Sequence, residues 1–154
     1  MRDLSDILAE NCIDAGLSAA NKKALFQQLG AAASRRTGLP PRDIVNCLNE
    51  REKLGSTGFG GGTAIPHGRI EVPRVFGFFA RLTTPIDFHA VDNLPVDLVF
   101  LLLSPLDAGA DHLKALAGVS RTLRDRNTVA KLRGARSKDA IYALLTGTET
   151  LHAA

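Results

Sequence analysis

The chain has 154 residues, 45% of them hydrophobic, and a formal net charge of +3 at pH 7. We expect a single domain over residues 1–154 with one core, ordered from about residue 4 to about residue 146 and followed by a frayed tail. The longest apolar run, residues 98–103, is too short to span a membrane, and the mild positive charge does not indicate nucleic-acid binding.

Residues 1–6 lack the basic and apolar regions of a signal peptide, so we expect a cytoplasmic protein. The two cysteines, Cys12 and Cys47, lie far apart and lack metal-ligand spacing. We therefore interpret both as reduced, partly buried thiols rather than as a disulfide or a catalytic group.

Apolar residues at helical spacing predict a short helix near residues 4–8 and a longer one over about residues 20–36. Between them, residues 11–16 have the pattern of a connection or a short edge strand. A third helix is predicted over about residues 41–53, because Pro41 suits the first turn of a helix.

The middle of the chain has strand character. Residues 64–65 are predicted to form a short buried strand, with a connection over residues 68–74 after it. Aromatic and β-branched residues predict a strand over residues 75–82, followed by a turn-rich loop over residues 84–95. The nearly all-apolar stretch 96–103 predicts a central strand that is covered on both faces.

The last third of the chain is predicted to be helical. A helix that Asp111 opens has an expected inner face of Leu113, Leu116, Ala117, Ser120 and Leu123. A short helix follows over residues 127–133, and Ser137 caps a final helix. Because helical and strand patterns alternate, the fold class is α/β, with helices packed on a small mixed sheet.

Basic residues recur along these last helices at positions expected to be exposed, namely Arg121, Arg124, Arg126, Lys131, Arg133, Arg136 and Lys138. We interpret them first as a solvated face. A docking patch for an acidic partner is the second interpretation, and a nucleic-acid site is the third.

A run of glycines and hydroxyl residues, 55–63, leads to His67. Glycine permits positive φ, and successive backbone N–H groups in such turns can surround an anion. Pro66 keeps the backbone extended just before His67, and a neutral imidazole is a nucleophile at neutral pH. The pattern indicates a histidine that carries phosphate; the alternative is a flexible loop followed by a solvated histidine.

Two known phosphate-binding motifs do not fit the run. A Walker A loop requires lysine where Gly61 stands, and the dinucleotide fingerprint requires glycine where Thr63 stands. Arg51, near the end of a predicted helix, could pair with phosphate through two hydrogen bonds or could be solvated. His112, in the first turn of a predicted helix, could donate to a phosphoryl oxygen or could be solvated.

Residues 51–58 and 64–68 resemble the signature of the IIA domains of the fructose/mannitol class of the bacterial phosphoenolpyruvate-dependent phosphotransferase system. Residues 86–100 look especially like the nitrogen-regulatory branch of that class, the free-standing IIA-Ntr proteins. The similarity runs over roughly residues 4–146, and the histidine signature is long and specific. The resemblance implies a mixed β-sheet flanked by helices, the mannitol-type IIA fold.

The resemblance also implies roles for individual residues. His67 matches the family's phosphorylated histidine, Arg51 its active-site arginine, and His112 its second active-site histidine. Loop residues would surround the phosphoryl oxygens, namely Gly55, Ser56, Thr57, Gly58 and Gly60. No metal or cofactor is implied, and His89 is assigned no role.

The resemblance implies that phosphate comes from the carrier protein NPr, which a dedicated enzyme I charges from phosphoenolpyruvate. The chain would be a phosphoryl-transfer component with a chiefly regulatory role, whose phosphorylation state acts on potassium transporters, sensor kinases or other regulators. One alternative is a sugar-specific IIA that passes phosphate to a IIB domain, and another is a binding module that is never phosphorylated. We expect neither nucleic acid nor membrane insertion.

Overall fold

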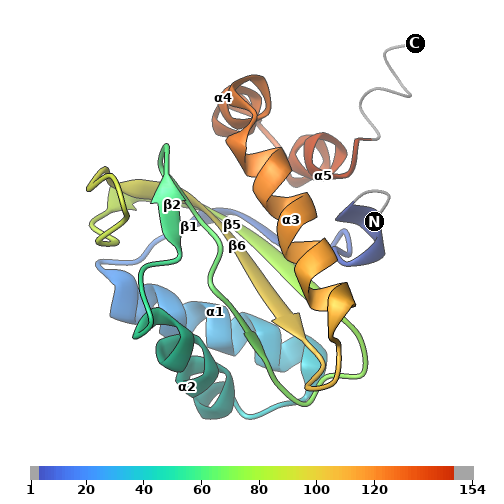
Figure 1. The fold of residues 1–154 in the computed structure, drawn as a ribbon. Coiled ribbons are helices and arrows are strands. Elements are labelled where there is room, and N and C mark those ends of the chain that lie inside the picture. The colour runs from blue at the N-terminus through green and yellow to red at the C-terminus, as the bar shows by residue number, and fades with distance from the viewer. Residues whose placement is uncertain (1–3, 148–154) are drawn as a thin grey trace.

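A computed structural model describes residues 4–147 and shows a six-stranded mixed β-sheet (Figure 1). Helices α1 and α2 lie on one face of the sheet, and α3, α4 and α5 lie on the other (Figure 1). The strands are β1 (Ile13–Leu17), β2 (Gly58–Gly60), β3 (Thr63–Ala64), β4 (His67–Arg69), β5 (Phe76–Ile86) and β6 (Val96–Ser104). The helices are a 3-10 turn η1 (Leu4–Asp6), α1 (Lys22–Thr37), α2 (Pro41–Glu52), α3 (Ala110–Arg124), α4 (Arg126–Gly134) and α5 (Lys138–Thr146). The predicted fold class is confirmed.

Strand β6 forms the centre of the sheet. It pairs antiparallel with β5 and parallel with both β3 and β4, in the strand order β1-β5-β6-β3-β2. Every residue of β6 except Asp97 is buried, which confirms the prediction of a central strand covered on both faces. The prediction of an edge strand near residues 11–16 is also confirmed, because β1 lies at one edge of the sheet.

Capping residues set the helix boundaries close to the predicted ones. The side chain of Asn21 caps the start of α1, and Gly38 ends that helix with a φ of 78°. Pro41 occupies the first turn of α2, and Ser137 caps α5 by accepting a backbone N–H. At the N-terminus, the short helix predicted near residues 4–8 is only the 3-10 turn η1.

Two segments that were predicted to be loops contain strand. The predicted connection 68–74 begins inside β4, whose three residues pair in parallel with Leu102–Ser104 of β6. Strand β5 continues to Ile86, past the predicted start of the 84–95 loop, and pairs there with Val96 after an irregular stretch. Both strands depend on pairing with β6, a long-range contact that local patterns do not contain.

The predicted inner face of α3 is wrong at most positions, because Leu113 and Ala117 are exposed, Leu116 and Ser120 are half-buried, and of the predicted residues only Leu123 is buried. Leu113 is 62% exposed, whereas His112 is only 7% exposed. The buried stripe of the helix consists of His112, Ala115, Gly118, Val119 and Leu123. For most of the helix the buried stripe thus lies about one position, or about 100°, from the predicted one, and His112 within it hydrogen-bonds Ser104 at the end of β6. Gly109, not Asp111, is the N-cap residue.

Other sequence predictions concern the surface and the thiols. The basic residues of the last helices are all exposed, and Cys12 and Cys47 are both free thiols, as predicted. The predicted frayed tail lies almost wholly outside the described residues, although Thr146 belongs to α5. Within residues 4–147, no helix has both the length and the apolar character needed to cross a bilayer.

Candidate functional site

His67 begins β4, the short strand that pairs with the last residues of β6. It is in register with Leu102, whose N–H donates to the carbonyl of Pro66 at 3.0 Å. On the other side, Gly68 packs closely against α2, where an added Cβ would displace Sγ of Cys47. The sheet and α2 together therefore hold the backbone of His67 in a defined place.

The hydrogen bonds of the His67 ring define its tautomer. Nδ1 lies 2.7 Å from the carbonyl oxygen of Ile65, which can only accept, so Nδ1 carries the proton. In the neutral ring, Nε2 then has a free lone pair, and Nε of Arg51 donates to it at 3.2 Å. The nitrogen available for nucleophilic attack is therefore Nε2.

The surroundings of His67 favour the neutral ring. Burial lowers the pKa of His67 most strongly, and the Arg51 guanidinium lowers it further. The Ile65 carbonyl and the Glu52 carboxylate act in the opposite direction, but the net pKa stays below the ordinary histidine value. The imidazole therefore keeps its nucleophilic lone pair at neutral pH.

A second imidazole, that of His112, lies beside the first. The two ring centroids are 5.7 Å apart, with 43° between the ring planes. Nδ1 of His112 lies 2.6 Å from Oγ of Ser104, which is fully buried at the end of β6. Burial lowers the pKa of His112, and His67 and Arg69 lower it further. The ring is thus oriented by Ser104 and is favoured in its neutral form.

The depressed pKa values predict how stability depends on pH. In the window below about pH 6.5, the ordinary histidine pKa, the unfolded chain binds more protons at His67 and His112 than the folded chain does. The free energy of unfolding should therefore fall as pH is lowered from about 7.5 to about 5.5. Urea titrations at several pH values measure this slope. A His67→Gln/His112→Gln variant should show a shallower slope, and an unchanged slope would contradict the prediction.

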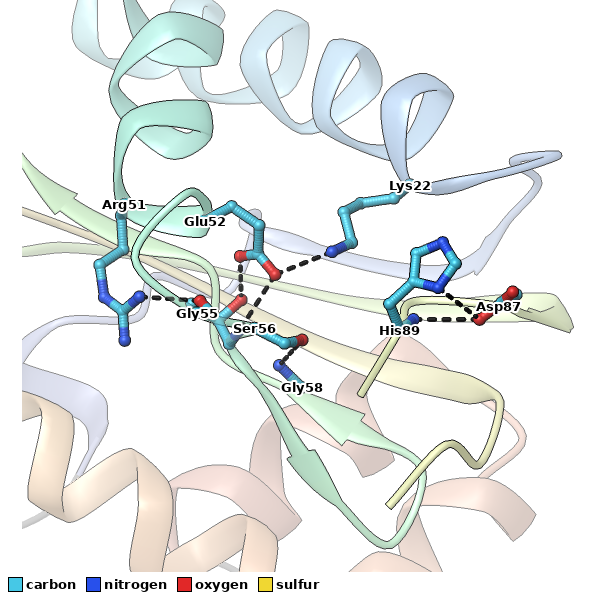
Figure 2. A network of polar contacts seen from close by, with 9 residues as sticks. Lys22, Arg51, Glu52, Gly55, Ser56, Gly58, Asp87 and His89 are labelled. Atoms are coloured by element: carbon cyan, nitrogen blue, oxygen red, sulfur yellow. Dashed lines mark hydrogen bonds and ion pairs between the residues drawn. The ribbon is translucent and has the colours of Figure 1, made fainter. Parts of the chain in front are cut away.

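Arg51, in the last turn of α2, connects the histidine to the glycine-rich loop. Its Nε donates to His67. Its Nη1 donates to the carbonyl of Gly55 at 2.9 Å (Figure 2). The guanidinium of Arg51 therefore lies against Nε2 of His67, and its hydrogen bond to the carbonyl of Gly55 holds it there. The structure thus brings together His67, His112 and Arg51, which the sequence had singled out separately.

The glycine-rich loop is organised by the carboxylate of Glu52. Glu52 accepts from the backbone N–H of Thr57 at 3.0 Å and from its hydroxyl at 2.7 Å. The N–H of Gly58 donates to Oγ of Ser56 (Figure 2). The N–H of Gly55 donates to the carbonyl of Glu52. Three of the N–H groups expected to surround an anion are therefore already bonded inside the protein.

Gly60 lies further along, at the end of β2, where an added Cβ would meet the Asp92 carboxylate. The neighbouring N–H of Gly61 donates to that carboxylate at 3.0 Å. The phosphate-binding role of Gly55, Ser56, Thr57, Gly58 and Gly60 stays a prediction. The loop also has a structural role, because the carbonyl of Gly55 accepts from Arg51 and holds its guanidinium in place.

Sequence reasoning missed Glu52 as part of the site. Its side chain is 9% exposed and forms an ion pair at 2.9 Å with Lys22, whose side chain is 22% exposed (Figure 2). Nζ of Lys22 also lies 4.4 Å from the ring centroid of Phe88. One signal was available, because an acidic residue at the C-terminal end of a helix opposes the helix dipole and so requires another partner.

His89, to which no role was assigned, lies on an exposed turn. Its backbone N–H donates to Asp87 at 3.0 Å, and its Nδ1 lies 3.5 Å from the same carboxylate oxygen (Figure 2). Its φ of 57° is that of a left-handed turn residue. Within residues 4–147, no group of three or more His, Cys, Asp or Glu side chains could hold a metal ion.

Comparisons with known proteins agree with this architecture. The crystal structure of the mannitol IIA from Escherichia coli superposes with a TM-score of 0.75 and 22% identity, covering 90% of this chain and 98% of that one. The IIA-Ntr crystal structure from Neisseria meningitidis gives a TM-score of 0.89 at 37% identity, covering 93% of this chain and 99% of that one. The fold is therefore that of the mannitol-type IIA domains.

The sequence comparisons are more specific. The profile of the family described as "Phosphoenolpyruvate-dependent sugar phosphotransferase system, EIIA 2" matches residues 6–147. A nitrogen regulatory protein from Bradyrhizobium diazoefficiens is 49% identical over 143 residues, which cover 92% of this chain and 94% of that protein. The chain therefore belongs to the EIIA type 2 family of phosphotransferase components, and within it to the nitrogen regulatory, IIA-Ntr, proteins.

Proposed function

We propose that His67 accepts a phosphoryl group from a phosphohistidine carrier protein, NPr, and that the phosphorylation state of the chain regulates its partners. The observation that carries this proposal is the unprotonated Nε2 of His67, which faces the guanidinium of Arg51 and lies beside the ring of His112. A nucleophile next to a cation and a second imidazole is the arrangement that a dianionic adduct requires.

The transfer follows from this geometry. Nε2 attacks the phosphorus in line, the P–N bond to the donor imidazole breaks, and its electron pair stays on the donor nitrogen. Nδ1 of His67 keeps its proton, which is bonded to the Ile65 carbonyl throughout. Arg51 shifts its Nε–H from Nε2 to the phosphoryl oxygens, while Nη1 stays anchored on Gly55. His112 donates to another phosphoryl oxygen.

The regulatory part of the proposal rests on the nitrogen regulatory relatives and on charge. Phosphorylation adds up to about two negative charges beside Arg51. A partner that contacts this surface then binds the two forms with different affinity, which is what makes a switch. In this proposal a dedicated enzyme I charges NPr from phosphoenolpyruvate, and the regulated partners are cytoplasmic domains of potassium transporters, sensor kinases or other regulators.

The test is reconstitution of the full chain with enzyme I, NPr and phosphoenolpyruvate, read by intact-protein mass spectrometry. We expect a gain of one phosphoryl group per chain that is labile in acid and stable in alkali. NMR of the product should place the phosphorus on Nε2. Failure to label would overturn the proposal and leave a binding module that is never phosphorylated. Efficient transfer from the labelled chain to a sugar-specific IIB domain would instead favour a sugar-transport IIA.

The Arg51→Ala variant should be phosphorylated more slowly by a factor on the order of a hundred, because it lacks the cation closest to the developing charge. Rapid-quench measurement of labelling by phosphorylated NPr gives this rate. Arg42→Ala is the matched control, since Arg42 is exposed at the start of the same helix. Equal rates for the two variants would remove Arg51 from the site.

The His112→Gln variant should still be labelled on His67, but about tenfold more slowly. The glutamine amide retains a hydrogen-bonding group toward Ser104, so the fold should be kept, while the imidazole donor to the phosphoryl group is lost. The rate is measured in the same labelling assay, and peptide mapping locates the phosphate. Phosphate on His112 in the unmodified chain would show that the two histidines have the reverse roles.

A further inference from the structure

A concave surface lies at the other end of α3 from the histidines. It is a groove of about 500 Å³ between the β2–β3 turn and the junction of α3 with α4. Its apolar floor includes Leu123 and Val129, both buried, and its rim includes Arg124, Arg126 and Arg133, which are exposed. No acidic residue lines it among the described residues.

Two of the three arginines are held in place by the protein. The guanidinium of Arg133 forms three hydrogen bonds with Asp97, at 2.8, 2.9 and 3.2 Å, and a fourth with the carbonyl of Gly61 at 2.9 Å. That of Arg124 lies 4.6 Å from the ring centroid of Phe59. These contacts orient the rim before any ligand binds, which reduces the entropy that binding would cost.

The rim keeps a positive charge after its internal pairs are counted. Asp97 neutralises Arg133, whereas neither Arg124 nor Arg126 forms an ion pair within residues 4–147. The acidic neighbour Asp125 is turned toward the first turn of α4, where it accepts from Asn127 and from a threonine hydroxyl. Carboxylates of a partner would therefore meet two uncompensated arginines beside an apolar floor.

The groove is separate from the histidine site. Leu123 follows His112 by eleven positions along α3, which places them roughly 16 Å apart along the helix axis. The two sites also lie at different points along β6. The carbonyl of Gly62, beside the groove, accepts from the N–H of Asp97 at the start of the strand, whereas His67 pairs with Leu102 near its end. A ligand in the groove thus need not contact the histidines, although α3 and β6 contribute to both sites.

We propose that this groove is a docking site for an acidic segment of a partner protein, a segment that places an apolar side chain on the floor and carboxylates on the arginine rim. The apolar floor and the oriented guanidinium groups favour such a segment over a nucleic-acid backbone, which has no apolar side chain to bury. The site does not depend on whether His67 accepts phosphate.

The experiment uses the full unphosphorylated chain and a fluorescein-labelled peptide in which a central leucine is flanked by glutamates. We expect binding with a Kd below about 1 mM by fluorescence anisotropy. In ¹⁵N NMR spectra, the shifted amides should gather at Gly60, Gly61 and α4. A peptide with glutamine in place of glutamate should bind at least about tenfold more weakly.

Two charge reversals provide the decisive comparison. Arg126→Glu lies on the rim, and Arg136→Glu lies in the same basic region but outside the groove; both side chains are exposed. We expect Arg126→Glu to weaken binding at least about tenfold and Arg136→Glu less than about twofold. Equal losses, shifts centred elsewhere, equal binding of the glutamine peptide, no binding below about 1 mM, or tighter binding of labelled duplex DNA would each overturn the proposal.

Discussion

The His67→Ala variant is expected to take up no phosphate from NPr, whereas the unmodified chain takes up one group. Alanine removes the only nitrogen that combines a free lone pair with a hydrogen bond from Arg51 among the described histidines. The neighbouring ring of His112 does not substitute for it, because His112 is buried and its Nδ1 is committed to Ser104. Intact-protein mass spectrometry after incubation with the complete donor system measures the outcome.

The control for this variant is His89→Ala. His89 is exposed and contacts Asp87, so its removal changes the histidine content without touching the site. It should be labelled at the rate of the unmodified chain. A phosphate on the His67→Ala chain would show that another nucleophile accepts the group. Loss of labelling in both variants would mean that the assay reports damage to the fold rather than the loss of one imidazole.

Much of this site could be predicted because its signals are local. Pro66 and His67 are adjacent in the sequence, and the glycine-rich run lies just before them. Arg51 is separated from that run by only a few residues, since the last turn of α2 leads directly into the loop. The central strand β6 was also predictable, because a nearly all-apolar stretch such as residues 96–103 is typical of a strand buried on both faces of a sheet.

What could not be predicted depends on contacts between distant segments. In the sequence, Ser104 is only the polar residue that follows the apolar stretch 96–103, and the packing of α3 on β6 shows that it orients His112. The same packing buries His112 and leaves Leu113 exposed, where the apolar pattern predicted burial. Similarly, the N–H groups of the loop could be counted from the sequence, but their engagement with Glu52 could not.

The Glu52→Ala variant should lose about 3 kcal/mol of unfolding free energy, because the change removes one partner of a largely buried ion pair. Lys22 would stay desolvated without its carboxylate, and the N–H and hydroxyl of Thr57 would lose their acceptor. Phosphorylation should also slow, since the loop would no longer hold Gly55 against Arg51. Urea unfolding gives the free energy, and the labelling assay gives the rate.

Two further variants of the same helix separate these effects. Glu50→Ala removes a carboxylate that is 72% exposed and pairs with Lys53, which is 70% exposed, so neither stability nor rate should change measurably. Glu52→Gln keeps an oxygen that can accept from Thr57 but loses the charge that faces Lys22. It should restore most of the labelling rate while stability stays reduced. If Glu52→Gln and Glu52→Ala label equally slowly, the charge of Glu52 rather than its hold on the loop governs the site.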